Sequence, residues 1–332
     1  MRLHAVVVTH DRCEQLHRTV TRLLREPLDA IHVVDNASSD GTPEMLSTFS
    51  DPRLHVLRQA DNLGGAGGFA KGLAAALGEG ADWVVVMDDD GRPEPGTLSR
   101  FRRQPPTEHE AVASAVLLPG GRICEMNRPG RNPFARPGLF LGMLFGGLGR
   151  FRLHDAAYRA TAPIAIDAAS FVGLFLSATC LHRGGLPDPR LFIYGDDVLY
   201  CLRLRAEGLR LAFDPRLRFE HDCRTLHGSR GIFRPLWKTY FHHRNLIFVL
   251  RAAAGARLLP LVVPFALAVW TARVRFYRRE ERGRYLSLLA RAVRDGLNGC
   301  TDASLAEIRG LAGEVHVPPQ APPASVSDRR AA

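Results

Sequence analysis

The chain contains 332 residues, of which 46% are hydrophobic, and it carries a formal net charge of +10 at pH 7. A chain of this length and composition can bury a full core, which is typical of an α/β domain with additions. Its six cysteines form no Cys-x-x-Cys pair, which argues against a zinc site or a disulfide framework. The positive charge predicts an anionic partner. Because the apolar stretch at the N-terminus is too short for a signal peptide, we expect a cytoplasmic protein.

The first hundred residues alternate strand-like and helix-like patterns, as a doubly wound sheet requires. Short apolar runs predict strands at 3–8, 31–34, 54–57 and 83–87, and a helix is predicted over 67–77. A polar cluster follows each strand, and the four clusters are 9–12, 35–36, 61–62 and 88–90. Because the carboxyl ends of parallel strands meet at one edge of a sheet, we expect the four clusters to converge there.

The most informative cluster is the carboxylate triplet Asp88, Asp89 and Asp90, which directly follows the apolar run Trp83–Met87. Three adjacent anions repel one another unless a cation compensates them. Oxygen ligands suit Mg²⁺ or Mn²⁺, which often hold substrate phosphates as well. The pattern therefore favours a metal–diphosphate site, and the alternative is a solvated acidic turn before Gly91.

The two clusters after the first and second strands suit a nucleotide. Asp35 can accept a hydrogen bond from a base N–H, and Asp11 or Arg12 can hold the ribose or a phosphate. The alternative is that Asp35 and Asn36 form an Asx turn that caps the end of the strand.

The loop Asn62–Phe69 holds four glycines within five positions and runs directly into a helix. Backbone N–H groups at Gly64, Gly65 and Gly67 can therefore approach a sugar or a diphosphate closely. The spacing is neither a dinucleotide fingerprint nor a P-loop. A flexible turn is the alternative.

In the second half, Asp196 and Asp197 precede a helical pattern that ends at Gly208. Carboxylates at a helix N-terminus are favoured by the helix dipole, so we expect the pair to be ionised at neutral pH. An ionised carboxylate can act as a general base. The alternative is a plain N-cap.

A strand is predicted over 209–213, and His221 follows it between Glu220 and Asp222. By pattern alone, a His between acidic residues is typical of a solvated loop.

In this order and placement, the motifs resemble those of the inverting family-2 glycosyltransferases, which have a GT-A fold and bind a nucleotide sugar. The matching positions are Thr9, Arg12, Asp35, Asn62, Gly64, Asp88 and Asp90, and the resemblance covers roughly residues 3–250. The expanded glycine loop looks most like that of the galactofuranosyltransferase branch, whereas rhamnosyltransferases show a shorter version.

The resemblance implies roles for individual positions. Asp197 is the expected base, and Asp196 is its neighbour that orients the acceptor. His221 is the expected third ligand of Mn²⁺ or Mg²⁺, together with Asp88 and Asp90. The expected donor-binding residues are Thr9, Asp11, Arg12, Asp35, Asn36, Asn62, Gly64, Gly65, Gly67 and Asp89. The expected acceptor-binding residues are Tyr194, Arg244 and Asn245.

The uncharged segment Leu258–Ala272 is flanked by arginines on both sides. As a helix it is about 22 Å long, too short for a hydrocarbon core of about 30 Å. The pattern predicts an interfacial anchor on an anionic membrane surface. A buried helical hairpin with a solvated basic face is the alternative. Nucleic-acid binding, which would favour aromatic residues interleaved with Arg over a groove, is not favoured, because the arginines border a purely apolar run.

We therefore expect a GT-A fold with a Rossmann-like, mostly parallel sheet and helices on both faces, followed by a helical membrane-associating region. Residues 1–118 are the expected nucleotide-sugar-binding half and 119–250 the acceptor-binding half. The helical basic region is expected over 251–312, and a disordered tail over 313–332.

The predicted function is metal-dependent, inverting sugar transfer at the cytoplasmic face of the inner membrane. The expected donor is a UDP-sugar, with galactofuranose as the best assignment, and the expected acceptor is lipid-linked or a polysaccharide of the cell envelope. Rhamnosyl or N-acetylhexosaminyl transfer within the same family is an alternative. A non-catalytic nucleotide-sugar-binding scaffold at the membrane is another, against which the presence of Asp88, Asp90, Asp197 and His221 argues.

Overall fold

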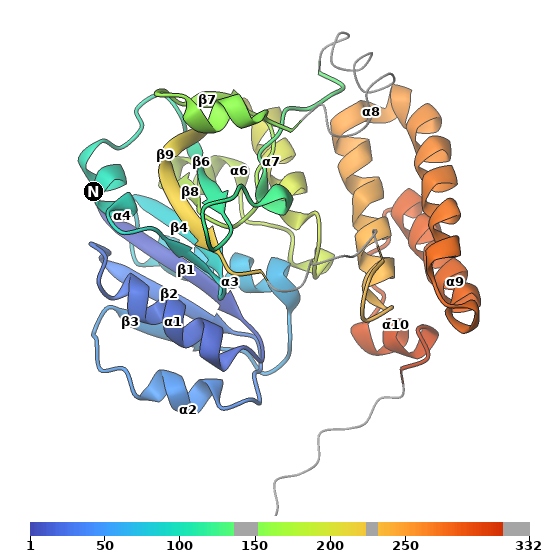
Figure 1. The fold of residues 1–332 in the computed structure, drawn as a ribbon, viewed down its shortest axis with the longest axis horizontal. Helices are drawn as coiled ribbons and strands as arrows, with labels where there is room; N and C mark the ends of the chain where they lie inside the picture. Colours follow the sequence, from blue (N-terminus) through green and yellow to red (C-terminus); the bar gives the residue numbers. More distant parts are fainter. Residues whose placement is uncertain (136–151, 224–231, 315–332) are drawn as a thin grey trace, which may run out of the picture.

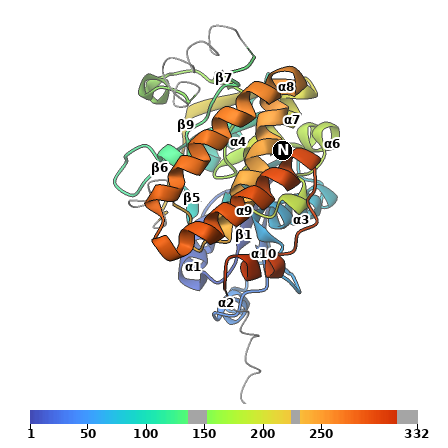
Figure 2. The ribbon, with the colours of Figure 1, turned by 90° about the vertical axis from the view of Figure 1, so that its right-hand side faces the viewer.

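The computed structural model describes residues 1–135, 152–223 and 232–314. These residues form one mixed nine-stranded sheet with helices on both faces and a helical unit beside it (Figure 1). Figure 2 shows the helical unit in front of the sheet. The tail expected over 313–332 lies outside the described residues from position 315 onward.

The N-terminal half of the sheet is parallel and follows the order β3-β2-β1-β4. Its strands are β1 (Leu3–Thr9), β2 (Ala30–Asp35), β3 (Leu54–Arg58) and β4 (Trp83–Asp88). All four predicted strands are confirmed. β1 and β2 are buried along their whole length, as the continuous apolar runs indicated, because helices cover both faces of a parallel sheet.

The remaining strands make the sheet mixed rather than mostly parallel. These strands are β5 (Gly91–Pro93), β6 (Ala111–Leu117), β7 (Ile164–Ile166), β8 (Leu174–Ser177) and β9 (Leu211–His221). β8 runs antiparallel to β4 and β6, and β5 and β7 run antiparallel to β9. Only β6 and β9 pair in parallel among these five.

β9 is longer than the strand predicted over 209–213. The register against β6 shifts between Ser114 and Ala115, where Asp214 and then Arg218 are the partners on β9. Such a bulge accommodates Pro215, because the proline then leaves no ladder hydrogen bond unmade. The strand therefore continues to His221, which is buried, so the solvated loop that the local pattern alone indicated is not formed.

Two groups of helices cover the two faces of the sheet. One face packs against α1 (Cys13–Leu23) and α4 (Thr97–Arg103), and α2 (Thr42–Ser47) contributes Leu46 to the same core. The other face packs against α3, α6 and α7. These three helices span Gly64–Gly78, Ala178–Gly184 and Asp196–Ala206. Within the described residues before α8, short 3₁₀ turns lie in the connections at Glu125–Asn127 (η1), Asp155–Arg159 (η3) and Pro189–Leu191 (η4).

The helical unit has a hydrophobic core of its own. It consists of α8 (Lys238–Ala272), η5 (Arg273–Phe276), α9 (Arg279–Asn298) and α10 (Leu305–Leu311). The boundary expected at 251 falls inside α8, so the unit begins earlier than predicted. Polar residues in the first turns of α8 suggested an acceptor site, but they point into the protein, as described below.

α8 consists of two helical arms that meet at Gly255, whose φ of 70° and ψ of 171° are not helical. The arms run side by side as a hairpin (Figures 1 and 2). Lys238–Phe276 is long and apolar enough to cross a membrane by length and composition. Each arm alone is about 25 Å long, somewhat less than the roughly 30 Å of a hydrocarbon core.

The second arm of α8 leaves an apolar face open to solvent. Leu261 and Phe265 are 68% and 67% exposed, and Val269 is 37% exposed. The opposite face of this arm carries Val263 and Trp270, which are buried. The hairpin alternative is therefore right about topology, but the hairpin is not buried.

Substitution of Gly72 can test how tightly α3 packs on the sheet. A β-carbon at Gly72 would be 2.3 Å from Val6 Cγ1 and 3.1 Å from Val34 Cγ2, both in the packed core. We expect Gly72→Ala to lower the free energy of unfolding by about 1–3 kcal/mol through overpacking. Gly78→Ala in the same helix is the matched control, because nothing lies within 4 Å of its added carbon. The control should be neutral or stabilising by up to about 1 kcal/mol. Urea unfolding of both variants measures the difference, and equal stabilities would contradict the close packing.

Candidate functional site

The carboxyl ends of β1 and β4 bring the predicted donor-side residues together. Thr9 Oγ1 donates a hydrogen bond to Asp89 Oδ2 at 2.8 Å. The Arg12 guanidinium lies 3.4 Å from Asp89 Oδ1 and 2.9 Å from Asp90 Oδ2. The triplet is therefore not a solvated turn, because Asp89 and Asp90 are buried and paired with a cation.

The three carboxylates of the triplet differ in their affinity for a proton. Burial raises the pKa of Asp88 to about 6, and the charge of Asp90 adds to this effect. Burial likewise raises the pKa of Asp89 to about 7, although Arg12 opposes it. Burial also disfavours the Asp90 anion, but hydrogen bonding to His221 outweighs this and holds the pKa of Asp90 below its usual value. The raised pKa values of Asp88 and Asp89 show that Arg12 and His221 compensate these anions only in part, so a further cation would stabilise them.

His221 ends β9 directly beside the triplet. Its Nε2 lies 3.0 Å from Asp90 Oδ1, and its Nδ1 lies 2.7 Å from Asn127 Oδ1. Burial alone would lower the pKa of His221, but the hydrogen bond to Asp90 raises it to about 10. The imidazole therefore carries a proton here, and a metal ion bound at this nitrogen would take the place of that proton.

The predicted ligands fit a divalent ion. One oxygen each from Asp88 and Asp90 and one nitrogen of His221 all lie within 4.8 Å of one another. Two carboxylates and one imidazole form a donor set that Mn²⁺ or Mg²⁺ accepts. The structure thus brings the three predicted metal ligands together.

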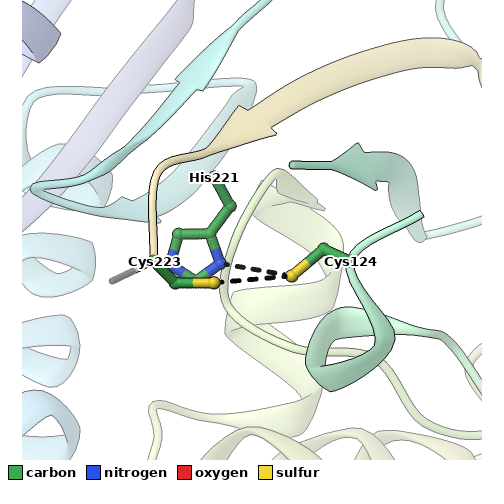
Figure 3. Close-up of side chains that lie close together, drawn as sticks. All are labelled: Cys124, His221 and Cys223. Atoms are coloured by element: carbon green, nitrogen blue, oxygen red, sulfur yellow. Dashed lines mark hydrogen bonds between the residues drawn. The ribbon is translucent and has the colours of Figure 1, made fainter. Parts of the chain in front are cut away.

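Two cysteines flank His221 on its other side (Figure 3). Cys124 Sγ lies 3.9 Å from His221 Nδ1 and 3.9 Å from Cys223 Sγ. The two cysteines are separated by about a hundred residues in the sequence, so no local spacing motif revealed them. The sequence argued against a zinc site because it has no Cys-x-x-Cys pair, yet Cys124, His221 and Cys223 have potential ligand atoms within 4.8 Å of one another.

Asp35 is fully buried and uses its two oxygens differently. Oδ1 accepts a hydrogen bond from Ser38 N at 3.0 Å, so the Asx-turn alternative is right for this atom. Oδ2 has no hydrogen-bond partner within the described part of the chain, and Arg58 Nε is 4.0 Å away. A buried oxygen in this state is ready to accept a hydrogen bond from a ligand.

The neighbouring donor-side residues hold the loop ends together. Asn36 Nδ2 donates to Gly64 O at 3.0 Å, which links the end of β2 to the start of α3. Asp11 has a φ of 51°, and its Oδ1 accepts a hydrogen bond from Ser39 N at 2.7 Å. Asn62 Oδ1 accepts from Gly64 N at 2.8 Å. Donor contact by these residues stays a prediction.

The glycine-rich segment is the first turn of α3, which begins at Gly64 rather than at Gly67. A β-carbon at Gly64 would lie 2.2 Å from the carbonyl oxygen of Phe192, and Ala66 N donates to that same oxygen at 3.0 Å. The glycines therefore let the helix approach the Phe192 loop closely. Gly67 is similarly crowded by Leu63, whereas Gly65 has open space around it. A packing role thus accounts for Gly64 and Gly67, and donor contact here stays a prediction.

Asp196 and Asp197 form the first turn of α7. Burial raises the pKa of Asp197 to about 6, and the charge of Asp88 adds to this effect. Burial, followed by the charge of Asp197, raises the pKa of Asp196 well above its usual value. Burial therefore opposes the helix dipole, which was expected to keep both carboxylates ionised. The charge of Asp88 acts on both carboxylates.

Tyr194 lies in the strained loop that leads to this pair. Its φ is 68°, and Phe192 has a φ of 67°, both unusual for residues with a side chain. The Tyr194 side chain packs beside Phe233 and His242, with ring centroids 5.7 and 5.8 Å apart, and remains 36% exposed. An accessible aromatic ring beside the pair is compatible with acceptor contact, which stays a prediction.

Arg244 and Asn245 do not face an acceptor. Both are buried on the inner side of α8. Asn245 Nδ2 lies 2.8–2.9 Å from the carbonyl oxygens of Leu191, Ile193 and Tyr194. Arg244 donates to the carbonyl of Leu191 at 3.0 Å. The prediction of acceptor binding is wrong because these groups satisfy the backbone of the loop before Asp196.

Sequence reasoning also missed two residues near the site. Lys238 begins α8, and its pKa lies below the usual value because of burial and then the nearby charge of Arg12. Asn127 holds the His221 ring and donates to Ser170 Oγ at 2.9 Å. Neither residue belongs to a sequence motif, and only the tertiary fold brings them to this edge.

Comparison with known proteins places these observations in context. Residues 5–130 match the family model described as glycosyl transferase family 2. The chain is 31% identical over 273 residues to galactofuranosyltransferase GlfT1 of Mycolicibacterium smegmatis, an alignment that covers 77% of this chain and 85% of that protein.

Two solved structures share the fold. One is residues 1–349 of TarS of S. aureus in complex with UDP, with a TM-score of 0.55 and 12% identity over 94% of this chain and 83% of that one. The other is the mannosyltransferase PcManGT of Pyrobaculum calidifontis in complex with GDP-Man and Mn²⁺, with a TM-score of 0.51 and 17% identity over 89% of this chain and 87% of that one. At these identities the likeness concerns the fold alone.

Proposed function

The chain belongs to glycosyltransferase family 2, and from this premise we propose that it transfers galactofuranose from UDP-galactofuranose, with inversion, to a lipid-linked or polysaccharide acceptor of the cell envelope. The observation that carries the proposal is the electrostatic coupling of two carboxylate groups from different halves of the fold. The charge of Asp88, at the end of β4, helps to raise the pKa of both Asp196 and Asp197 at the start of α7. A donor-side anion and a candidate base therefore belong to one site.

Galactofuranose is favoured as the sugar by the 31% identity to galactofuranosyltransferase GlfT1 over most of both chains. The expanded Gly-Gly-Ala-Gly-Gly segment after Asn62 supports the same branch of the family. Rhamnosyl and N-acetylhexosaminyl transfer are the alternatives within the family, and they differ from the main proposal in the nucleotide sugar that binds.

The donor diphosphate would be held by cations at the edge of the sheet. Asp88, Asp90 and His221 would hold Mn²⁺ or Mg²⁺, which when bound neutralises charge on the diphosphate. Arg12 lies against Asp89 and Asp90, and Lys238 lies close enough to Arg12 to lower its own proton affinity. These side chains would bind and orient the phosphates, while the free Oδ2 of Asp35 would accept a hydrogen bond from the base.

Asp197 is the proposed general base. It takes the proton of the acceptor hydroxyl while that oxygen attacks the anomeric carbon of the donor sugar. The bond from the anomeric carbon to the diphosphate breaks, and its electrons leave with UDP, so the configuration inverts. A pKa of about 6 suits this role, because the carboxylate is ionised near neutral pH yet more basic than an exposed aspartate.

The exposed face of α8 is proposed to lie on the cytoplasmic surface of the inner membrane. Its centre is formed by Leu261 and Phe265, whose large apolar side chains are mostly exposed. Arginines flank this arm, at positions 257, 273, 275, 278 and 279, and four of these five are exposed. An apolar face bordered by cations fits an interface with anionic lipids, where a lipid-linked acceptor would be found.

The donor and metal assignments are tested together by titrating the purified chain with UDP-, dTDP- and GDP-sugars in the presence of Mn²⁺ or EDTA. We expect UDP-galactofuranose to bind with the highest affinity, and we expect EDTA to weaken UDP binding, because buried carboxylates would otherwise repel the diphosphate. Asp90→Asn should weaken the effect of Mn²⁺, with Asp302→Asn, an exposed surface site, as the control. Equal UDP affinity with and without metal would reject the metal assignment, and a preference for dTDP-rhamnose would support the rhamnosyl alternative.

Asp197→Asn separates catalysis from donor binding. Asparagine keeps the size of the side chain but cannot accept the proton, so we expect kcat to fall by about 10²- to 10⁴-fold with UDP affinity nearly unchanged. In the unmodified enzyme, activity should decline as the pH falls through about 6, since the inactive protonated carboxyl accumulates below its raised pKa. Transfer by the variant at the normal rate would place the base elsewhere. Absence of transfer by the unmodified enzyme with every donor and acceptor would instead favour a binding scaffold.

Replacing Arg273, Arg275, Arg278 and Arg279 with Gln tests the membrane surface. Each basic residue contributes about 1 kcal/mol near an anionic surface, so partitioning into phosphatidylglycerol vesicles should fall by about three decades. The charge-matched control replaces four exposed arginines elsewhere, at 100, 103, 122 and 159. Phe265→Gln should also weaken binding, whereas Val56→Gln, an exposed position on β3, should not. Vesicle sedimentation that is equal for both arginine sets would contradict a specific docking face.

A further inference from the structure

Three histidines lie in a row across β1, β2 and β3, toward the amino ends of these strands. His32 and His55 are direct register partners, and His4 lies two residues before Val6, which is the partner of His32 on β1. This end of the sheet is opposite the edge that carries Thr9 and Asp88. The row is therefore separate from the proposed transferase site.

The histidines share the sheet face that α3 covers. Val6 and Val34 lie two residues after His4 and His32 on the same strands, so they point to the same face of the sheet, and both pack against α3. Because α3 ends at Gly78, the helix stops before it covers the histidines, and Glu79 follows directly over the row. Three imidazoles and one carboxylate thus converge from four different elements of the fold.

The distances among these groups match the edges of a small coordination shell. His4 Nδ1 lies 3.1 Å from His32 Nε2, and His32 Nε2 lies 3.7 Å from Glu79 Oε2. His55 Nδ1 lies 3.3 Å from the other Glu79 oxygen. A tetrahedral ion with bonds of about 2.0–2.1 Å separates its ligand atoms by about 3.3–3.4 Å. The ligand atoms of His4, His32 and Glu79 are all within 4.8 Å of one another.

Packing alone does not explain these side chains. His4 and His32 are 3% and 0% exposed, yet valine or isoleucine would fill a buried strand position without polar atoms. His32 Nδ1 has no hydrogen-bond partner among the residues that the structure describes. Burial lowers the pKa of His32 to about 4 and also lowers that of His4. Both rings are therefore neutral at pH 7, which is the form that binds metals.

The surroundings allow a cation to reach and to be held at this row. The Glu79 and His55 side chains are 42% and 38% exposed, which leaves a route from solvent. Asp29 and Arg2 also act on His4, with opposite signs, so Glu79 supplies the net negative charge of the cluster.

We propose that His4, His32 and Glu79 form a second metal site, selective for Zn²⁺ or an ion of similar preference, that fastens β1 and β2 to the end of α3, with His55 on β3 as the partner that holds the Glu79 carboxylate. Imidazole donors suit Zn²⁺, whereas the carboxylate-rich site at Asp88 and Asp90 suits Mn²⁺ or Mg²⁺. His4, His32 and Glu79 would occupy three positions of a tetrahedral shell and leave the fourth to water. This proposal does not depend on the proposed transferase function.

Cobalt binding to the full chain tests the site directly. Tag-free protein is stripped with EDTA and titrated with Co²⁺, whose visible spectrum reports tetrahedral geometry and whose thiolate charge-transfer band marks cysteine ligation. We expect one equivalent of Co²⁺ to give tetrahedral bands that persist in Cys223→Ser and in Asp90→Asn, because neither the cysteines beside His221 nor the carboxylates at Asp88 and Asp90 are its ligands. Competition with Zn²⁺ should displace the cobalt, and Zn²⁺ should raise the melting temperature.

Variants at the two accessible side chains of the cluster, the ligand Glu79 and its partner His55, decide the assignment. His55→Ala and Glu79→Gln should each weaken Zn²⁺ binding by more than about tenfold, which is the loss seen even for outer partners of metal ligands. His182→Ala, an exposed histidine outside the row, is the control and should bind as the unmodified chain does. Equal binding by all three variants, or loss of the ion in Cys223→Ser alone, would overturn the proposal. UDP affinity in Mn²⁺ should stay unchanged in His55→Ala, so failure of this site and failure of the transferase proposal are distinguishable.

Discussion

The constraint on which the rest of the structure depends is the gathering of five carboxylates at one edge of the sheet. These carboxylates belong to Asp88, Asp89, Asp90, Asp196 and Asp197, and burial raises the pKa of four of them. Buried anions are costly unless cations and hydrogen bonds compensate them. Arg12 and the protonated His221 supply part of that compensation within the chain. The negative charge that they leave uncompensated favours binding of a metal ion. That metal ion and Arg12 would also suit a diphosphate.

The two halves of the fold are joined at this edge by backbone contacts that glycine and asparagine make possible. Gly64 lets the first turn of α3 meet the carbonyl of Phe192, and Asn245 Nδ2 of α8 lies 2.8–2.9 Å from three carbonyl oxygens of the same loop, to which its two N–H groups donate. The loop therefore keeps its strained conformation at Phe192 and Tyr194. Held in this way, it fixes where Asp196 and Asp197 begin α7. Positioning of the candidate base thus depends on residues that do not touch it.

Much of the donor side was predictable from the sequence, and the acceptor side was not, for identifiable reasons. Strands buried on both faces read as continuous apolar runs, so β1, β2 and β4 and the polar residues at their ends were found. β9 passes through Pro215 at a bulge, which no local pattern reveals. Arg244 and Asn245 look like surface ligands because they are polar, yet their partners are carbonyls about fifty residues away. Cys124 and Cys223 likewise meet only in the folded chain.

The helix that braces the acceptor loop also carries the exposed apolar face. The first arm of α8 places Asn245 under the Tyr194 loop and Lys238 near Arg12, and the second arm, after Gly255, carries Leu261 and Phe265. The two arms belong to one core, in which Trp270 of the second arm packs against His243 of the first at 4.8 Å between ring centroids. A surface docked on lipid through the second arm would therefore hold the first arm, and with it the base, at a fixed distance from the membrane. If the acceptor is lipid-linked, as proposed, its hydroxyl would lie near that surface, and docking would reduce the search for acceptor from three dimensions to two.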